Sequence, residues 1–148
     1  MHITDFLAPE RIFLDVRVRS KTQLLAEVAR NFAQLGPLTD AAMIEAALKA
    51  REHLGSTGLG DGFALPHARI ETLPTYKGMF LRLQKPIEFE AIDGNPVSMV
   101  FVLLMPGGEA ASHVNALAAI SRLFRDAAVV DALHRAPSIK AAWNVFSK

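Results

Sequence analysis

The feature that most constrains the fold is the run VSMVFVLLM (Val97 to Met105), in which Ser98 is the only polar residue. A strand with one face in water would alternate apolar and polar residues, whereas this run is apolar at almost every position. It therefore predicts a central strand that is covered on both faces. Pro106, Gly107 and Gly108 follow the run and are expected to end the strand.

Three shorter apolar segments predict further strands. IFLDV (12–16) is typical of a short strand, and MFLRL (79–83) alternates loosely between apolar and polar residues. FALPH (63–67) predicts a short buried strand that ends at Pro66, because proline has no N–H to donate within a sheet.

Helical patterns separate these strands along the chain. Ser20 begins an S-x-x-Q capping box, and a helix is expected to follow and to end at Gly36 and Pro37. The apolar residues that recur at helical spacing in this segment are Leu24, Leu25, Val28, Ala29 and Phe32.

Thr39 or Asp40 is expected to cap a second helix, which stops at Gly55. Its apolar positions, Met43, Ile44, Ala47 and Leu48, lead toward Arg51 and Leu54. Later helices are expected from about Glu109 to Arg125, after Asp126 and after Ser138.

The alternation of strands and helices predicts the α/β class. We expect a single three-layer domain over residues 1–148, with a mixed β-sheet flanked by helices on both faces. Its hydrophobic share of 51% provides enough apolar side chains for a substantial core. One sequence leaves the order of the strands open.

Composition argues against several classes of function. Formal net charge is +1, so no strong positive field is available to bind nucleic acid or anionic lipid. Cysteine is absent, which excludes thiol nucleophiles and is compatible with a reducing cytoplasm. The start MHITDFLAPE lacks a signal-peptide pattern, and no apolar stretch reaches the roughly 20 residues that span a membrane. We therefore expect a soluble cytoplasmic protein with no membrane insertion and no nucleic-acid partner.

His67 is the first candidate for chemistry. It directly follows Pro66 and a glycine-rich segment, GSTGLGDG (55–62), whose backbone N–H groups can form a concave anion site. A neutral imidazole has a free ring nitrogen that can attack a phosphoryl group. The ordinary alternative is a half-buried histidine that only forms hydrogen bonds.

Arg51 and His113 are the next candidates. Arg51 shares a helix face with Ile44 and Leu48 and can clamp a phosphate, although an arginine near a helix end is more commonly a surface ion pair. His113 begins the stripe of Leu117, Ile120 and Phe124, at a helix N-terminus that favours anions. A core histidine that binds a backbone carbonyl is its ordinary alternative.

Ser56, Thr57 and Gly58 are candidates for binding phosphoryl oxygens, because they contribute hydroxyls and a loop amide, although such residues also form ordinary turns. His2, His53 and His134 are explained by solvated positions. We expect no metal or cofactor, because H-E-x-x-H and cysteine ligands are absent. The nucleotide motifs G-x-x-x-x-G-K-[ST] and G-x-G-x-x-G are also absent.

The segment AREHLGSTGLGDGFALPHA (50–68) resembles the signature of type-2 enzyme IIA domains, the fructose, mannitol and nitrogen-regulatory class of bacterial phosphoenolpyruvate-dependent phosphotransferase systems. The likeness extends through SKTQLL, PIEFEAIDGNPVSMVFVLLMP and HVNALAAISRLFRD, and so covers nearly the whole chain. It implies that His67 accepts a phosphoryl group on Nε2 from the histidine-containing phosphocarrier protein. It also implies that His113 and Arg51 support the site.

Three positions differ from the usual pattern: Asp61 stands where asparagine is common, Ala68 replaces a glycine, and Phe63 precedes ALPH. The negative charge of Asp61 is expected to slow transfer or to lower the phosphorylated fraction.

FEAIDGNPV (89–97) and the later segments resemble the nitrogen-regulatory type, whose phosphorylation state changes its binding to regulatory targets. A fructose or mannitol component that passes phosphate to a IIB transporter component is the close alternative. More distant alternatives are a binding module that is not phosphorylated and a metal-dependent hydrolase.

Overall fold

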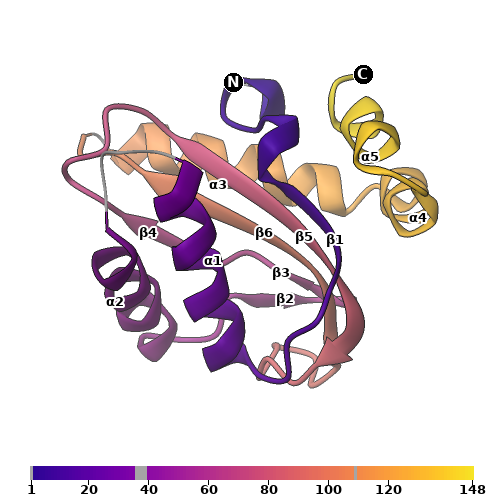
Figure 1. Cartoon of the computed structure of the whole chain (residues 1–148), viewed down its shortest axis with the longest axis horizontal. Helices are drawn as coiled ribbons and strands as arrows, with labels where there is room; N and C mark the ends of the chain where they lie inside the picture. Colours follow the sequence, from indigo (N-terminus) through magenta and orange to yellow (C-terminus); the bar gives the residue numbers. More distant parts are fainter. Residues whose placement is uncertain (1, 36–39, 109) are drawn as a thin grey trace.

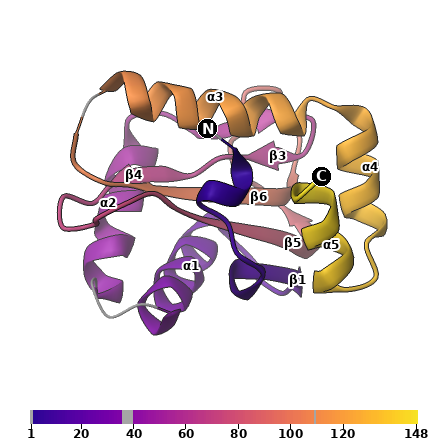
Figure 2. The same cartoon turned by 90° about the horizontal axis from the view of Figure 1, so that it is seen from above.

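The computed structural model describes residues 2–35, 40–108 and 110–148. Within these residues a mixed six-stranded sheet lies between two layers of helices (Figures 1 and 2). The predicted α/β fold is therefore confirmed. The strand order is β1-β5-β6-β3-β2, and β4 pairs with β6.

The described strands are β1 (Ile12–Val16), β2 (Gly58–Gly60), β3 (Phe63–Ala64), β4 (His67–Arg69), β5 (Lys77–Ile87) and β6 (Val97–Met105). The described helices are α1 (Lys21–Leu35), α2 (Ala41–His53), α3 (Ala110–Phe124), α4 (Ala127–Arg135) and α5 (Ile139–Phe146), with 3-10 turns at Ile3–Asp5 and Pro9–Arg11.

Strand β6 is the centre of the sheet, as its continuous apolar run predicts. It pairs antiparallel with β5 and parallel with β3 and β4. Its side chains alternate between two buried clusters, because successive residues of a strand point to opposite faces. Val100, Val102 and Leu104 pack on the side of α1 and α2. Met99, Phe101, Leu103 and Met105 pack on the side of α3, α4 and α5.

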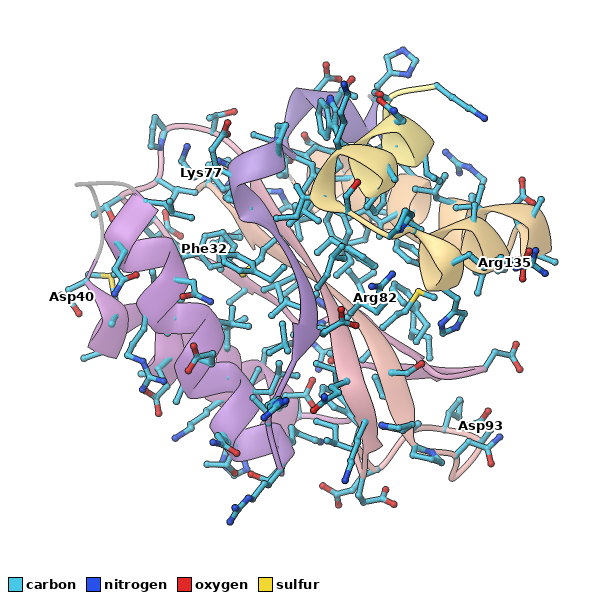
Figure 3. All side chains as sticks on the ribbon, turned by 45° about the vertical axis from the view of Figure 1, so that its right-hand side comes forward. Phe32, Asp40, Lys77, Arg82, Asp93 and Arg135 are labelled. Atoms are coloured by element: carbon cyan, nitrogen blue, oxygen red, sulfur yellow. The ribbon has the colours of Figure 1, made fainter. Side chains whose placement is uncertain are left out.

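Capping residues begin the helices where the sequence predicts. Ser20 Oγ accepts a hydrogen bond from Gln23 N before α1, and the Gln23 side chain accepts from Arg19 N. Asp40 accepts from Met43 N before α2. All five predicted apolar residues of α1 are buried, and Figure 3 shows Phe32 on its inner side. Gly36, Pro37, Thr39 and Glu109, which the predicted helix boundaries include, lie outside the described residues.

Arg82 holds the two C-terminal helices against the sheet. It projects from β5 toward α4 and α5 (Figure 3) and donates to the carbonyls of Leu133 at 2.9 Å and Ala136 at 2.7 Å. Its other guanidinium nitrogen pairs with Asp15 of β1 at 3.2 Å. The connection between α4 and α5 is therefore tied to two strands.

The glycine-rich segment is not a loop along its whole length, because its second half forms a β-hairpin with the residues that follow. β2 pairs antiparallel with β3, and the turn between them is Asp61-Gly62, both with positive φ (54° and 79°). Such φ values favour the Asp-Gly pair in a two-residue hairpin turn. Gly58 also needs to be small, because a Cβ there would lie 2.8 Å from Cα of Ala91.

The prediction that FALPH is one strand ended by Pro66 is wrong. Pairing with β6 stops after Ala64 and resumes at His67, so the proline interrupts two short strands. Pro66 has no N–H, but its carbonyl accepts from Leu103 N at 3.0 Å and keeps the chain beside β6. His67 is therefore the first residue of β4 and not a residue beyond a strand end.

Candidate functional site

His67 lies at the edge of the sheet, on the face that α3 covers. Its neighbours Leu65 and Phe63, at alternate positions, belong to the buried cluster on the α3 side, whereas Ala64 and Ala68 face α1 and α2. Strand alternation therefore directs the imidazole toward the α3 side. The strand also runs beside α2, so that both helix layers border β4 (Figure 2).

Two hydrogen bonds define the tautomer of His67. Nδ1 lies 2.8 Å from the Leu65 carbonyl oxygen, which can only accept, so Nδ1 carries the proton. Arg51 Nε donates to Nε2 at 3.2 Å. Nε2 therefore holds the free electron pair, and it is the nitrogen that can act as a nucleophile.

The surroundings also keep this imidazole neutral. Burial of the ring lowers the pKa of His67 below its ordinary value, and the positive charge of Arg51 lowers it further. The hydrogen bond to Leu65 and the charge of Glu52 act in the opposite direction and are outweighed. At neutral pH the ring is therefore present mainly as the nucleophilic form.

Arg51 reaches His67 from the last turn of α2. Besides its bond to the imidazole, it donates from Nη1 to the Gly55 carbonyl at 2.9 Å. In the described part of the chain its hydrogen-bond partners are thus a ring nitrogen and a carbonyl, not a carboxylate. A guanidinium has five N–H donors, so others remain for an anion beside His67.

Glu52 holds the end of α2 in place. Its side chain is 7% exposed and pairs with Lys21 Nζ at 3.0 Å. It also accepts hydrogen bonds from the Thr57 N–H at 3.1 Å and from the Thr57 hydroxyl. Lys21 in turn lies 4.7 Å from the centre of the Phe89 ring. This network fixes the segment between Arg51 and the glycine hairpin, a role that the sequence does not reveal.

Ser56, Thr57 and Gly58 lie in that same segment, but their polar groups bind other parts of the protein. Ser56 Oγ donates to the Phe89 carbonyl at 2.8 Å and accepts from Gly58 N at 3.1 Å. Thr57 is 2% exposed and bonds to Glu52. The structure thus shows these groups supporting the loop, and direct contact with a phosphoryl group stays a prediction.

His113 is buried in the first turns of α3, with 8% of its surface exposed. Its Nδ1 lies 2.8 Å from the Tyr76 hydroxyl, a partner that sequence reasoning did not identify. Its Nε2 is buried without a hydrogen-bond partner in the described residues. His113 belongs to α3, so it lies over the face toward which His67 points. The hydrogen bonds connect Arg51 directly with His67, whereas His113 bonds to Tyr76.

Asp61 is separated from this site. It sits in the hairpin turn beyond Phe63, and Phe63 and His67 pair with positions of β6 that are four residues apart. At about 3.3 Å per residue, this places the turn at least about 13 Å along the sheet from His67. That exceeds the roughly 8 Å screening length of physiological salt, so its charge has little effect at Nε2.

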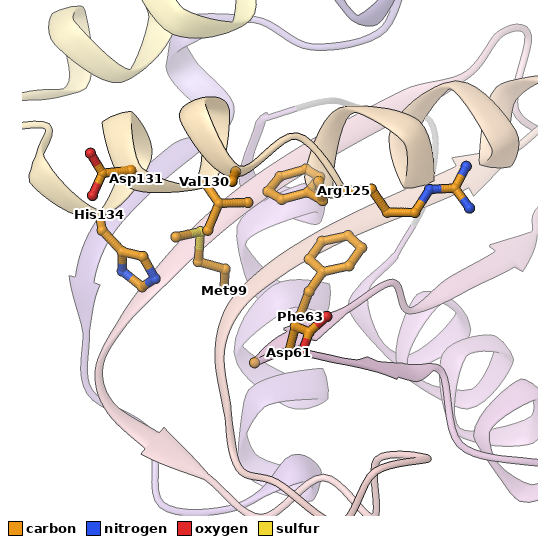
Figure 4. A pocket seen from close by; sticks show the side chains of 10 residues that line it. Asp61, Phe63, Met99, Arg125, Val130, Asp131 and His134 are labelled. Carbon is orange, nitrogen blue, oxygen red and sulfur yellow. The ribbon is translucent and has the colours of Figure 1, made fainter.

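A cavity of about 550 Å³ lies at the Phe63 end of β3 (Figure 4), and Arg51, His67 and His113 are not among its lining residues. The rings of Phe63 and Phe124 stack within it, with centres 4.1 Å apart. Val130 and His134 of α4 border it. The His67 ring therefore lies outside this cavity.

The pairing of a neutral nucleophilic nitrogen with an arginine suits transfer of an anionic group. Nε2 supplies the electron pair, the guanidinium can neutralise charge, and the α3 N-terminus favours anions on its side of the sheet. Within the described residues, no helix is both long and apolar enough to cross a membrane.

Comparisons with known proteins agree with this arrangement. Residues 5–148 match the family model "Phosphoenolpyruvate-dependent sugar phosphotransferase system, EIIA 2". A nitrogen regulatory protein of Bradyrhizobium diazoefficiens is 42% identical over 147 residues, which cover 99% of this chain and 95% of that protein.

Two further relatives differ in kind. The crystal structure of nitrogen regulatory protein IIA-Ntr from Neisseria meningitidis has a TM-score of 0.91 and 33% identity, and covers 97% of this chain and 98% of that one. The fructose-specific EIIABC component of Bacillus subtilis is 30% identical over 123 residues, which are 83% of this chain but 19% of that longer protein.

Proposed function

Because the chain belongs to the EIIA 2 family of the phosphoenolpyruvate-dependent sugar phosphotransferase system, we propose that it carries a phosphoryl group on Nε2 of His67. The observation that carries the proposal is the hydrogen-bonding of this ring: Leu65 holds the proton on Nδ1, and Arg51 lies beside the free Nε2. The donor is the histidine-containing phosphocarrier protein, and the protein acts in the cytoplasm.

The transfer is an in-line displacement between two histidines. The lone pair of His67 Nε2 attacks the phosphorus of the donor's phosphohistidine, and the donor's P–N bond breaks as the new one forms. The electrons of the broken bond return to the donor imidazole. Arg51 exchanges its bond to Nε2 for bonds to the phosphoryl oxygens, where negative charge concentrates. The reverse displacement passes the group to an acceptor.

The position of His67 also suits a protein donor. The imidazole is half-buried at the sheet edge, so another protein's phosphohistidine can approach it. A deep pocket of the kind that encloses a small substrate would exclude such a donor.

The protein acts as a nitrogen-type regulator, in which phosphorylation of His67 changes binding to target proteins. Similarity over nearly the full length of nitrogen regulatory proteins supports this reading. The second candidate is a sugar-specific component that passes the group to a transporter IIB component, which the fructose-specific relative favours.

Reconstitution tests the carrier function. Incubation with phosphoenolpyruvate, enzyme I and the phosphocarrier protein should add the mass of one phosphoryl group, which acid removes and base leaves. His67→Ala should abolish this gain, whereas His53→Ala, at an exposed histidine of α2, should retain it. An unlabelled wild-type protein, or a labelled His67→Ala variant, would reject the proposal.

Transfer to a IIB component separates the two candidate roles. A regulator should bind target proteins differently in its phosphorylated and unphosphorylated forms, and should transfer phosphate slowly or not at all to a purified fructose-type IIB component. Rapid transfer to IIB would favour the sugar carrier instead.

A further inference from the structure

Tyr76 immediately precedes β5 and holds its hydroxyl between two side chains of α3. The hydroxyl oxygen lies 2.8 Å from His113 Nδ1 and 2.5 Å from Ser112 Oγ. The Tyr76 ring packs edge-on against the imidazole, with centres 5.6 Å apart, and also against Phe6 at 6.4 Å. Packing thus fixes the phenol, and the two hydrogen bonds fix the direction in which its oxygen faces.

The arrangement of protons in this cluster follows from donor strength. A phenol O–H is a better hydrogen-bond donor than the N–H of a neutral imidazole, so the stronger arrangement has Tyr76 donating to Nδ1. Ser112 can then donate its own hydroxyl proton to the Tyr76 oxygen. With Nδ1 accepting, the single proton of neutral His113 must reside on Nε2.

That Nε2–H is buried and has no partner among the described residues. A buried donor without an acceptor is unfavourable, so such a group indicates a ligand that supplies the acceptor. His113 lies in α3, over the sheet face toward which His67 points, and close to the helix N-terminus, which favours anions. An oxygen of a phosphoryl group is the acceptor that fits these conditions.

We propose that Tyr76 is a positioning residue that holds His113 as an Nε2–H donor to the phosphoryl group on His67, with Ser112 completing the hydrogen-bonded chain. This inference rests on the proposed function. It gives the two histidines opposite tautomers for different tasks. The Leu65 carbonyl leaves His67 with a free Nε2 that attacks, whereas Tyr76 leaves His113 with an Nε2–H that donates.

The tautomer is measured without any phosphorylation. Long-range ¹H–¹⁵N NMR at slightly alkaline pH should show His113 of the wild-type protein protonated on Nε2 and His67 protonated on Nδ1. Tyr76→Phe keeps the packed ring but removes the hydroxyl, and should shift His113 toward the Nδ1–H form. A wild-type His113 protonated on Nδ1, or no change in Tyr76→Phe, would overturn the inference.

Rates of phosphoryl uptake from the phosphorylated carrier protein provide the second measurement. Tyr76→Phe should slow uptake about tenfold, the factor expected for one hydrogen bond to the transferring group. In a His113→Ala background the same change should have no further effect, because Tyr76 acts through His113. Additive losses would instead assign Tyr76 a role that is independent of His113 and reject the proposal.

Serine variants of α3 provide a matched control. Ser112→Ala removes the hydroxyl that bonds to Tyr76 and should slow uptake less than Tyr76→Phe. Ser121→Ala removes a hydroxyl more than two helical turns away and should leave the rate unchanged. Equal effects of Ser112→Ala and Ser121→Ala would contradict the proposed hydrogen-bonded chain from Ser112 through Tyr76 to His113. Failure of the wild type to be labelled rejects the proposed function, whereas a labelled wild type with an Nδ1–H His113 rejects this inference alone.

Discussion

Three neighbours determine the properties of the His67 ring. The Leu65 carbonyl selects the tautomer, the Arg51 guanidinium occupies the free nitrogen, and burial disfavours the charged form. The backbone places the first of these contacts two residues before the ring, but Arg51 is sixteen residues away on another element. The tautomer and the lowered pKa of this histidine are thus properties of a packed site and not of the ALPH motif alone.

The first prediction concerns pH. Because the pKa of His67 is lowered from its usual 6.5, the unfolded chain binds a proton more readily than the folded one as pH falls below that value. The free energy of unfolding should therefore be unaffected by this group above pH 6.5. It should decline as the pH falls from 6.5 to the lower pKa of the folded state. Urea unfolding across this range should show a decline that His67→Asn reduces, since asparagine does not titrate.

NMR titration of the His67 Cε1 proton checks the same shift directly. Its midpoint should lie below the ordinary histidine pKa of 6.5, and Arg51→Met should move it upward by removing a positive charge. A His67 midpoint at or above 6.5 would contradict the described environment.

The second prediction concerns the shape of Arg51. Lysine keeps the positive charge but loses the planar fork, which can bond to two phosphoryl oxygens at once. Arg51→Ala should slow phosphoryl uptake by about a hundredfold, the lower end of the effect of removing a donor to a developing charge. Arg51→Lys should slow it by about tenfold, because lysine keeps the charge and one point of contact. Stopped-flow or quenched-flow transfer assays would measure both. Arg30→Lys, on the exposed side of α1, is the control and should leave the rate unchanged.

At the scale of elements, the end of α2 is joined to α1 and to the connection between β5 and β6. Glu52 contributes the central carboxylate, which binds Lys21 and Thr57. Ser56 attaches the same segment to Phe89. Arg51 projects from this anchored helix end, so the network positions a side chain to which it does not itself bond.

The third prediction is that Glu52→Gln destabilises the protein. The amide keeps the size of the side chain but leaves Lys21, of which 18% is exposed, without its closest counter-charge. We expect a loss of about 1–3 kcal/mol in the free energy of unfolding. This is less than the loss from breaking a fully buried ion pair, because Lys21 contacts solvent. Glu45→Gln breaks a more exposed pair with Lys49 and should lose about 0–1 kcal/mol. Equal losses in urea unfolding would contradict the anchoring role.

The fourth prediction concerns the hairpin turn. Asp61→Asn removes a negative charge at a position with a positive φ of 54°, which asparagine also tolerates. Since the turn is at least about 13 Å along the sheet from His67, uptake should change by less than about twofold. The sequence alone predicts an acceleration. If Asp61→Asn is severalfold faster than the wild type in the transfer assay, the charge of Asp61 does slow transfer, and the argument from distance is wrong.

For the whole molecule, the sequence predicts what depends on local pattern. The apolar run of β6, the buried stripe of α1 and the caps at Ser20 and Asp40 are all visible in neighbouring residues. Sequence spacing alone does not predict that Arg51 contacts His67, but the family resemblance selects both residues.

The features that the sequence leaves hidden join distant segments. Lys21 meets Glu52 across 31 residues, and Tyr76 meets His113 across 37. Strand β4 begins at His67 because the chain pairs again with β6 there: His67 lies opposite Leu103, whose N–H donates to the Pro66 carbonyl. No local periodicity encodes such contacts, since they depend on how sheet and helices pack around each other.

The central claim is that Nε2 of His67 is the phosphorylated nitrogen. The most direct measurement is NMR of the ¹⁵N-labelled protein after phosphorylation by the reconstituted system, with ¹⁵N–³¹P coupling used to identify the bonded nitrogen. We predict coupling to Nε2 of His67, with Nδ1 still protonated and bonded to Leu65. Coupling to Nδ1, or to a nitrogen of any other histidine, would contradict the account.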